Sequence, residues 1–359
     1  PDDARGEPWN AAWLNTGKHN LNQMVLSAND ARTFCTINAS IGGKTLAQLS
    51  KGTGRFGRLT DGLDKAATAS GASSLVCAGI AFGQGEYDYS TIQGSTDRTR
   101  ALYKARLLTY FDDLQDEAAA RMPDQALPVP IMSYITSAGY TVDTDANGDP
   151  DLFVAMAQQE VADERSDTWI FGPSYPYPDK GGHLTANGSR WMAAKLAQVW
   201  SHVVLEGRDW TYLRPKRIEG IGNAIYVDFL VPAPPLKWLA TYVGRVATTY
   251  PDKGFRVIDT GNGNATVDIT VELVGQTIVR LNLVGSYTSH ANLRVYYADK
   301  TVHNGGGNLA DSDPAIARDS YVYDADYMPV EDNIAALVGQ PYPLQNWCAP
   351  FFLPVGYGV

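Results

Sequence analysis

The chain has 359 residues, of which 44% are hydrophobic and 19% charged, so it can bury the cores of about two domains and is neither disordered nor fibrous. Its formal net charge of -10 at pH 7 argues against binding to nucleic acid or to an anionic lipid surface. No apolar run is long enough to span a membrane, and three cysteines are too few for a disulfide framework.

The first part of the chain, up to about residue 205, alternates short apolar segments with longer segments of helical periodicity. We predict strands over residues 33–40, 74–82, 129–134 and 168–172. Predicted helices cover residues 97–122, 150–164 and 185–206. This order is typical of an α/β layered domain with a mostly parallel sheet, which we assign to residues 1–206.

The second part, after Gly207, is rich in glycine, asparagine and proline. In residues 265–273 an apolar side chain occupies every second position, and threonine, aspartate or glutamate lies between. Residues 224–231, 277–284 and 293–298 show the same pattern. We therefore expect an antiparallel β domain over residues 207–359, resembling a β-sandwich, with residues 208–216 as the linker.

Three polar segments that contain glycine lie beside the predicted strands of the first domain. Residues 37–44 and 82–88 each follow a strand, and residues 179–185 precede the last helix. Open α/β sheets bind their ligands at the carboxyl ends of the strands, so these segments are candidates for a site. Taken singly, a Gly-Gly pair after a strand indicates only a tight turn, and a single histidine indicates only a solvated side chain.

In this order and at these intervals, the three segments resemble the SGNH (GDSL-like) hydrolase superfamily, and within it the carbohydrate esterases of the sialate O-acetylesterase type. The family's glycine block resembles residues 39–45, and its Gln-Gly-Glu-x-Asp block is matched by residues 84–88. The resemblance covers about residues 15–205. It implies a three-layer α/β/α, flavodoxin-like fold. It also implies an enzyme that hydrolyses acyl esters and requires no cofactor.

The resemblance also implies catalytic roles for individual residues. The family's last block carries an aspartate and a histidine before a helix, which makes His183 the general base that moves a proton near neutral pH. Asp179 would orient the imidazole of His183 through a bulge in the intervening Gly-Gly pair. The backbone N–H of Gly43 and the side-chain amide of Gln84 would donate hydrogen bonds to the developing oxyanion.

Substrate contacts are expected from Glu86, Tyr87 and Tyr177. Glu86 would orient its loop or bind a sugar hydroxyl, and the faces of the tyrosine rings would stack on a sugar ring. The alternative for each tyrosine is a place in the core or in a turn.

The family's nucleophile block, a Gly-x-Ser segment on the first strand, has no match in the sequence. Residues 1–30 hold a loop with tryptophans and one helix-like stretch, residues 16–31, so the domain is expected to begin after this block. Ser27 lies too close to the glycine block to leave room for the intervening helix, and Ser40 would occupy the oxyanion turn itself. The alternative is a domain that has lost its serine and only binds.

An acidic loop repeats the oxygen spacing of an EF-hand-type calcium loop, including the central glycine. Its candidate ligands are Asp143, Asp145, Asn147, Asp149 and Asp151. Val154 occupies the position where such a loop has a bidentate glutamate. We therefore favour an acidic surface loop that caps the following helix over a structural calcium site.

The other four histidines are expected to be structural. His19 and His202 lie in helical stretches, whereas His290 and His303 lie in the β domain with no acidic or nucleophilic partner nearby. His183 is therefore the histidine on which the chemistry is expected to depend.

Two functional hypotheses of different classes follow. The first is an enzyme that removes O-acetyl groups from a polysaccharide through a serine-bound intermediate. The arrangement of two domains loosely resembles proteins of bacteriophages and prophages, which implies a virion or extracellular location and assembly with itself or with other virion proteins. The second is a glycan-binding or structural virion component without catalysis. An acetylated glycan is the expected partner, and neither nucleic acid nor a membrane is.

Overall fold

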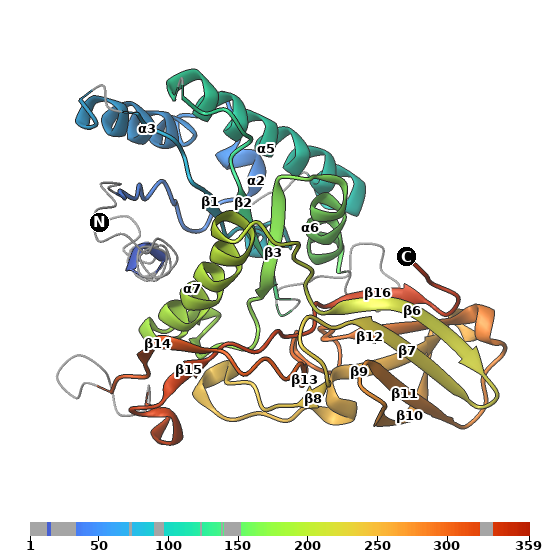
Figure 1. Ribbon diagram of the computed structural model, residues 1–359. Coiled ribbons are helices and arrows are strands. Elements are labelled where there is room, and N and C mark those ends of the chain that lie inside the picture. Colours follow the sequence, from blue (N-terminus) through green and yellow to red (C-terminus); the bar gives the residue numbers. More distant parts are fainter. Residues whose placement is uncertain are drawn as a thin grey trace.

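The computed structural model describes residues 13–15, 34–71, 74–89, 97–122, 124–137, 139, 152–323 and 333–359. These residues form a layered region of helices and strands, up to about residue 205, and a β-rich region after it (Figure 1). The α/β class expected for the first and the antiparallel strands expected for the second are confirmed. No helix in the described part of the chain is long and apolar enough to cross a membrane.

A parallel sheet forms the centre of the layered region. Its strands are β1 (Ile80–Phe82), β2 (Ile131–Ile135) and β3 (Thr168–Pro173), hydrogen-bonded in this order. In the register, Ile80 lies beside Ile131, which in turn lies beside Thr168. Because both pairings are parallel, the three carboxyl ends lie at one edge of the sheet, which we call the carboxyl edge.

Helices cover both faces of this sheet (Figure 1). They are α2 (Leu46–Leu49), α3 (Gly57–Ala69), α4 (Glu86–Tyr89), α5 (Arg100–Arg121), α6 (Phe153–Glu164) and α7 (Ala186–Trp200), which continues as the π-helical turn η2 (Ser201–Leu205). Ile131 packs in one apolar cluster with α5 and α6, whereas Met132 packs in another with α7. Adjacent residues of a strand point to opposite faces, so these helices lie on opposite sides. The flavodoxin-like strand order stays a prediction.

Two strand predictions in this region are wrong: one strand is not formed by the described residues, and the other is predicted too long. Residues 34–40 lie outside any strand, and Cys35 and Thr36 are exposed, so the segment buries too little for a central strand. The predicted strand over residues 74–82 is paired only within β1. The helix α3 has no counterpart among the predicted elements, because it holds few apolar residues and two glycines.

The β-rich region consists mainly of one antiparallel sheet of seven strands, in the spatial order β16-β12-β9-β10-β11-β7-β6. These strands are β6 (Arg214–Ile221), β7 (Ala224–Leu230), β9 (Phe255–Asp259), β10 (Ala265–Val274), β11 (Ile278–Val284), β12 (Leu293–Tyr297) and β16 (Phe351–Pro354). Short elements complete the β-rich region: β8 (Lys237–Trp238), β13 (Leu309–Ala310), β14 (Ile316–Ser320), β15 (Pro341–Pro343), η3 (Val243–Arg245), η4 (Pro251–Gly254), η5 (Thr260–Asn262), η6 (His290–Asn292) and η8 (Ala335–Leu337).

This sheet rolls around its own core until its two edges meet. After β16 the chain runs along β6, where the Ile218 N–H donates to the Tyr357 carbonyl at 2.9 Å. Inward-facing residues from all seven strands share one apolar cluster. The seven strands form one continuous sheet, because β10 pairs with β9 through residues 265–267 and with β11 through residues 268–274. The resemblance to a β-sandwich stays a prediction.

The two regions are in direct contact along α7. Tyr342 of β15 stacks on Trp191 of α7, with ring centroids 5.6 Å apart. The ammonium group of Lys195, also on α7, donates to the Leu344 carbonyl at 2.8 Å. The β-rich region thus returns to the helix that follows the third candidate segment.

Candidate functional site

The glycine block and the Gln-Gly-Glu-x-Asp block meet at the carboxyl edge. The buried carboxylate of Asp88 accepts hydrogen bonds from the Leu46 N–H, at 2.9 Å, and from the side-chain amide of Gln84. The same amide nitrogen of Gln84 also donates to the Lys44 carbonyl at 3.2 Å. One carboxylate and one amide therefore hold the start of α2 against the loop that follows β1.

Three residues from other elements complete this buried network. The Tyr103 hydroxyl of α5 donates to Oε1 of Gln84 at 2.9 Å, and Gln158 of α6 donates to the Gln84 carbonyl at 2.7 Å. Just after β2, the Thr136 N–H donates to Gln158 at 2.9 Å. Burial, and then the charge of Asp88, raise the pKa of Tyr103, so its hydroxyl stays protonated and remains a donor.

Sequence analysis does not identify these three residues as part of the site. Tyr103 and Gln158 lie on buried faces of α5 and α6, but hydrophobic periodicity does not separate a residue of a polar network from an ordinary core residue. Asp88 does carry a signal, because it is the last residue of the Gln-Gly-Glu-x-Asp match.

Of the two predicted oxyanion donors, Gln84 is already engaged. Its side chain is 8% exposed, and the hydrogen bonds to Lys44 and Asp88 use both hydrogens of its amide. Gly43 has a φ of +65°, which favours glycine, and a Cβ atom there would lie 3.2 Å from the Tyr87 hydroxyl oxygen. Tyr87 therefore lies against the glycine turn, and Gln84 holds that turn in place.

Glu86 and Tyr87 are partly exposed in the short helix α4 at the carboxyl edge. The two carboxylate oxygens of Glu86 lie 2.7 and 2.8 Å from the hydroxyl of Tyr134, near the end of β2. This donor fixes the direction of the carboxylate, whose remaining lone pairs are available to a ligand hydroxyl.

His183 lies exposed on a hairpin directly before α7. The hairpin pairs β4 (Asp179–Lys180) with β5 (His183–Leu184) through Gly181 and Gly182, whose φ values are +59° and +81°. Thr185 caps α7 by accepting the Gly188 N–H at 3.1 Å. The side chain of His183 is thereby placed next to the beginning of a helix that packs on the parallel sheet.

Asp179 and His183 both lie in the described part of the chain, and the hydrogen bond predicted between them is not formed. The Asp179 carboxylate accepts instead from the Gly182 N–H, at 3.0 Å, and from the Gly244 N–H in the β-rich region. The glycines do form the expected tight turn, but they direct the carboxylate to backbone donors across it.

Tyr177 is a core residue, so its predicted contact with a substrate is wrong for this packing. It is 3% exposed and lies edge to face with Trp191, at 5.7 Å between ring centroids. Burial raises the pKa of its hydroxyl. Of the two tyrosines predicted to contact a substrate, Tyr87 is the one that is partly exposed.

Several predicted residues lie outside the described part of the chain. These are Ser27 and the five candidate calcium ligands Asp143, Asp145, Asn147, Asp149 and Asp151. Ser40 is described: it is exposed, and its N–H donates to Asn38 at 3.0 Å. Across the described ranges, no group of three or more histidine, cysteine, aspartate or glutamate side chains is arranged to hold a metal ion.

The expectation that His303 has no acidic partner is wrong. Its Nδ1 lies 2.6 Å from the carboxylate of Asp299, four positions earlier, and the same carboxylate accepts from Arg256 at 2.6 Å. All three side chains are buried. The cluster lies in the β-rich region, where it anchors a glycine-rich loop.

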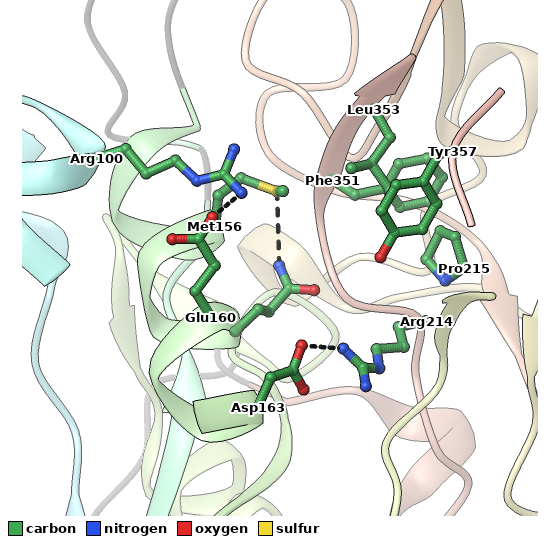
Figure 2. Close-up of a pocket in the computed structure, with 10 residues that line it drawn as sticks. Arg100, Met156, Glu160, Asp163, Arg214, Pro215, Phe351, Leu353 and Tyr357 are labelled. Atoms are coloured by element: carbon green, nitrogen blue, oxygen red, sulfur yellow. Dashed lines mark hydrogen bonds and ion pairs between the residues drawn. The ribbon is translucent and has the colours of Figure 1, made fainter. Parts of the chain in front are cut away.

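A separate pocket lies where α6 meets the rolled sheet, and Figure 2 shows its lining. Apolar walls come from Phe351 and Leu353, and the charged groups form the ion pairs Arg100–Glu160 and Arg214–Asp163. It contains none of the predicted site residues, and its charges neutralise one another, so we assign it no ligand.

No family model matches the chain, and no curated protein sequence matches it. Among solved structures, a carbohydrate acetylesterase from Xanthomonas citri is similar over 77% of this chain and 49% of its own, with a TM-score of 0.47 and 14% identity. A protein from Arabidopsis thaliana is similar over 44% of this chain and 57% of its own, with a TM-score of 0.33 and 17% identity.

The N-terminal part of the bacterial S-layer protein SbsC is similar over 87% of this chain and 57% of its own, with a TM-score of 0.19 and 11% identity. The chain therefore spans about half the length of the solved structures that it resembles. Similarities of this size leave the function to be argued from the residues at the carboxyl edge.

Proposed function

We propose that the protein is a carbohydrate O-acetylesterase of the serine type, acting on acetylated polysaccharide. The observation that carries the proposal is the buried Asp88–Gln84 network, which holds the Gly43 turn against the loop after β1. Such rigid support under a backbone donor is what preorganised stabilisation of an oxyanion requires. The exposed His183, before α7, supplies an imidazole, the side chain that most often serves as a general base.

The proposed reaction is an acyl transfer in two stages. A serine hydroxyl attacks the acetyl carbonyl and gives its proton to His183, while the Gly43 N–H stabilises the oxyanion. His183 then protonates the departing sugar oxygen. In the second stage a water molecule, deprotonated by His183, attacks the acetyl-serine carbonyl, and His183 returns the proton to the serine oxygen as acetate leaves. This serine is unassigned, because neither Ser27 nor Ser40 fits the position of the family's nucleophile.

Glu86 and Tyr87 are the proposed contacts to the sugar. The Glu86 carboxylate, held by Tyr134, would accept a hydroxyl, and the partly exposed ring of Tyr87 beside Gly43 would pack on a sugar face. A virion or extracellular location and assembly with other subunits belong to the same proposal.

A glycan-binding protein without catalysis is the second candidate. It is favoured by one observation: Asp179 binds the Gly182 and Gly244 N–H groups, so it does not orient His183 as a catalytic carboxylate would. This candidate needs no activated serine, and it predicts no turnover with any ester and tolerance of His183→Ala.

Acetate release from acetylated xylan and from 4-nitrophenyl acetate distinguishes the two candidates. We expect His183→Ala to lower the rate by at least about 100-fold, because general-base catalysis is lost. The matched control is His290→Ala, in the β-rich region, which should retain the rate of the unmodified protein. Equal rates for His183→Ala and the unmodified protein, or no acetate release from the unmodified protein, would contradict the esterase proposal.

A further inference from the structure

Two loops of the β-rich region reach the carboxyl edge of the layered region. In the loop of residues 299–308, the Gly305 carbonyl accepts from the Ser137 hydroxyl, which follows β2, at 3.1 Å. In the loop of residues 239–250, the Tyr242 N–H donates to the Pro176 carbonyl at 3.0 Å, just before the His183 hairpin. The Gly244 N–H of this second loop donates to Asp179, within the hairpin itself.

Asn308 joins these two loops through its side chain. Its Oδ1 accepts from the Tyr250 N–H at 2.7 Å, and its Nδ2 donates to the Leu239 carbonyl at 2.8 Å and to the Thr248 carbonyl at 3.0 Å. The side chain is 1% exposed, so neither amide hydrogen has water as an alternative partner. One residue thus fixes the beginning and the end of the loop of residues 239–250.

The path from Asn308 to the hairpin is continuous. Thr248, bound by Asn308, exchanges two backbone hydrogen bonds with Thr241, at 3.2 and 2.8 Å. Tyr242 and Gly244 lie one and three positions after Thr241, and each donates its N–H to the segment of residues 176–179. A change at Asn308 therefore acts on the hairpin through this chain of hydrogen bonds.

The loop of residues 299–308 has its own rigid anchor. The Asp299 carboxylate accepts from Arg256 and from Nδ1 of His303, and Nε2 of His303 lies 3.1 Å from the Pro251 carbonyl. The His303 ring therefore bridges the Asp299 carboxylate and the Pro251 carbonyl inside the β-rich region. Burial opposes ionisation of Asp299, but His303 and Arg256 hold the pKa of this carboxyl below its ordinary value.

Glycines allow this loop to pack closely. A Cβ atom on Gly306 would overlap the Tyr250 hydroxyl, and one on Gly307 would overlap the ring of Tyr297. The Asp299 cluster and this close packing hold Asn308 in one position. A residue can align another loop only if its own position is fixed.

We propose that Asn308 is a positioning residue for the His183 hairpin, and that the β-rich region sets the orientation of the proposed general base. The inference extends the proposed function to a residue far from His183 in sequence. The alignment of the hairpin can be measured whether or not the protein is an esterase.

The test is nuclear magnetic resonance of the full chain, with amide hydrogen exchange at Gly182 and Gly244 and the imidazole resonances of His183. Only five histidines are present, so single His→Gln variants assign these resonances. In Asn308→Ala we expect at least about tenfold faster exchange at Gly244 and a shifted His183 resonance. Local opening of the loop of residues 239–250 costs less free energy in this variant, because the hydrogen bonds of Asn308 are already absent. Core amides of β7 and β11 should keep their protection.

The matched control is Asn282→Ala, whose side-chain partners lie on the outer face of the rolled sheet, and it should change neither signal. If Asn308→Ala does not fold, Asp179→Ala tests the same path from its other end. It should also speed exchange at Gly244 and shift the His183 resonance.

Unchanged exchange at Gly244, or an equal increase at every amide, would overturn the inference. If acetate release is measurable, Asn308→Ala should lower kcat with little change in KM, because the base is misplaced while the sugar contacts remain. Absence of turnover together with faster exchange at Gly244 would contradict the proposed function and support the positioning role of Asn308.

Discussion

The two regions of the molecule use buried polar groups for different purposes. In the layered region, Asp88, Gln84 and Gln158 lie under the loops of the carboxyl edge and hold those loops to one another. In the β-rich region, an apolar core fills the rolled sheet, and Asp299 and Asn308 support loops that leave it. The residues proposed to act on a substrate thus belong to one region, but part of their support comes from the other.

The largest expected effect is a loss of stability when the buried charge cluster of the β-rich region is broken. Arg256→Met should lower the free energy of unfolding by about 3–5 kcal/mol, because it leaves the buried Asp299 carboxylate with one charged partner fewer. Urea denaturation measures this loss. Arg280→Met is the control: Arg280 pairs with Glu272 at an exposed site, where such pairs contribute about 0–1 kcal/mol. Similar losses in both variants would show that the cluster is not a structural anchor.

A second effect concerns the contact between the regions. Burial lowers the pKa of Lys195 to about 8, against an ordinary value of 10.5, although Asp313 opposes the shift. Between these two pH values the unfolded chain holds a proton that the folded protein has released, so the free energy of unfolding rises with pH. The expected total is on the order of 3 kcal/mol.

Lys195→Met should remove this rise, whereas Lys237→Met, at an exposed position of β8, should retain it. The measurement is urea denaturation of each protein at several pH values from 7 to 10.5. Parallel pH dependences for Lys195→Met and the unmodified protein would mean that the ammonium group is not desolvated between the regions.

Removal of the buried carboxylate in the layered region should have a smaller effect on stability. Asp88→Ala leaves the Leu46 N–H and one Gln84 amide hydrogen without a partner, at a cost of about 2 kcal/mol. Exchange at the Leu46 amide should increase while the strands of the rolled sheet keep their protection. Asp61→Ala, exposed on α3, is the control and should be neutral. Loss of protection throughout the chain would contradict a local role for Asp88.

The smallest expected effect is at the helix that follows the His183 hairpin. Thr185→Ala removes the side-chain acceptor of the Gly188 N–H and should cost about 1 kcal/mol in the free energy of unfolding. Thr109→Ala, at an exposed position within α5, should change stability by less than about 0.5 kcal/mol. Equal values for the two threonines would indicate that the cap does not stabilise α7.

The same two regions differ in how well their structure follows from sequence. In the rolled sheet, alternation predicts β7, β10, β11 and β12 to within about a residue at each end, because an apolar side chain recurs at every second position along each strand. Parallel strands lack this signal, so residues 34–40 are predicted as a strand and β1 is predicted too long. The joining of the strands into one sheet depends on pairings between distant segments, such as β7 with β11, which no local pattern specifies.

The candidate site also contains contacts that local sequence patterns do not predict. The motif match identifies Gly43, Glu86 and Asp88 as residues of neighbouring segments. It does not predict that Asp179 would bind Gly244, because these residues lie in different regions of the chain. Contacts between distant segments, such as that of Asn308 with Thr248, follow from the packing of whole elements.

Fluorophosphonate labelling of the protein from its native source, followed by peptide mapping, tests most directly whether this is a serine esterase with His183 as its base. We predict that a single serine is labelled and that His183→Ala slows its labelling by at least about 100-fold, because the serine then lacks its base. No labelled serine, or a labelling rate that is unchanged in His183→Ala, would contradict the proposed chemistry.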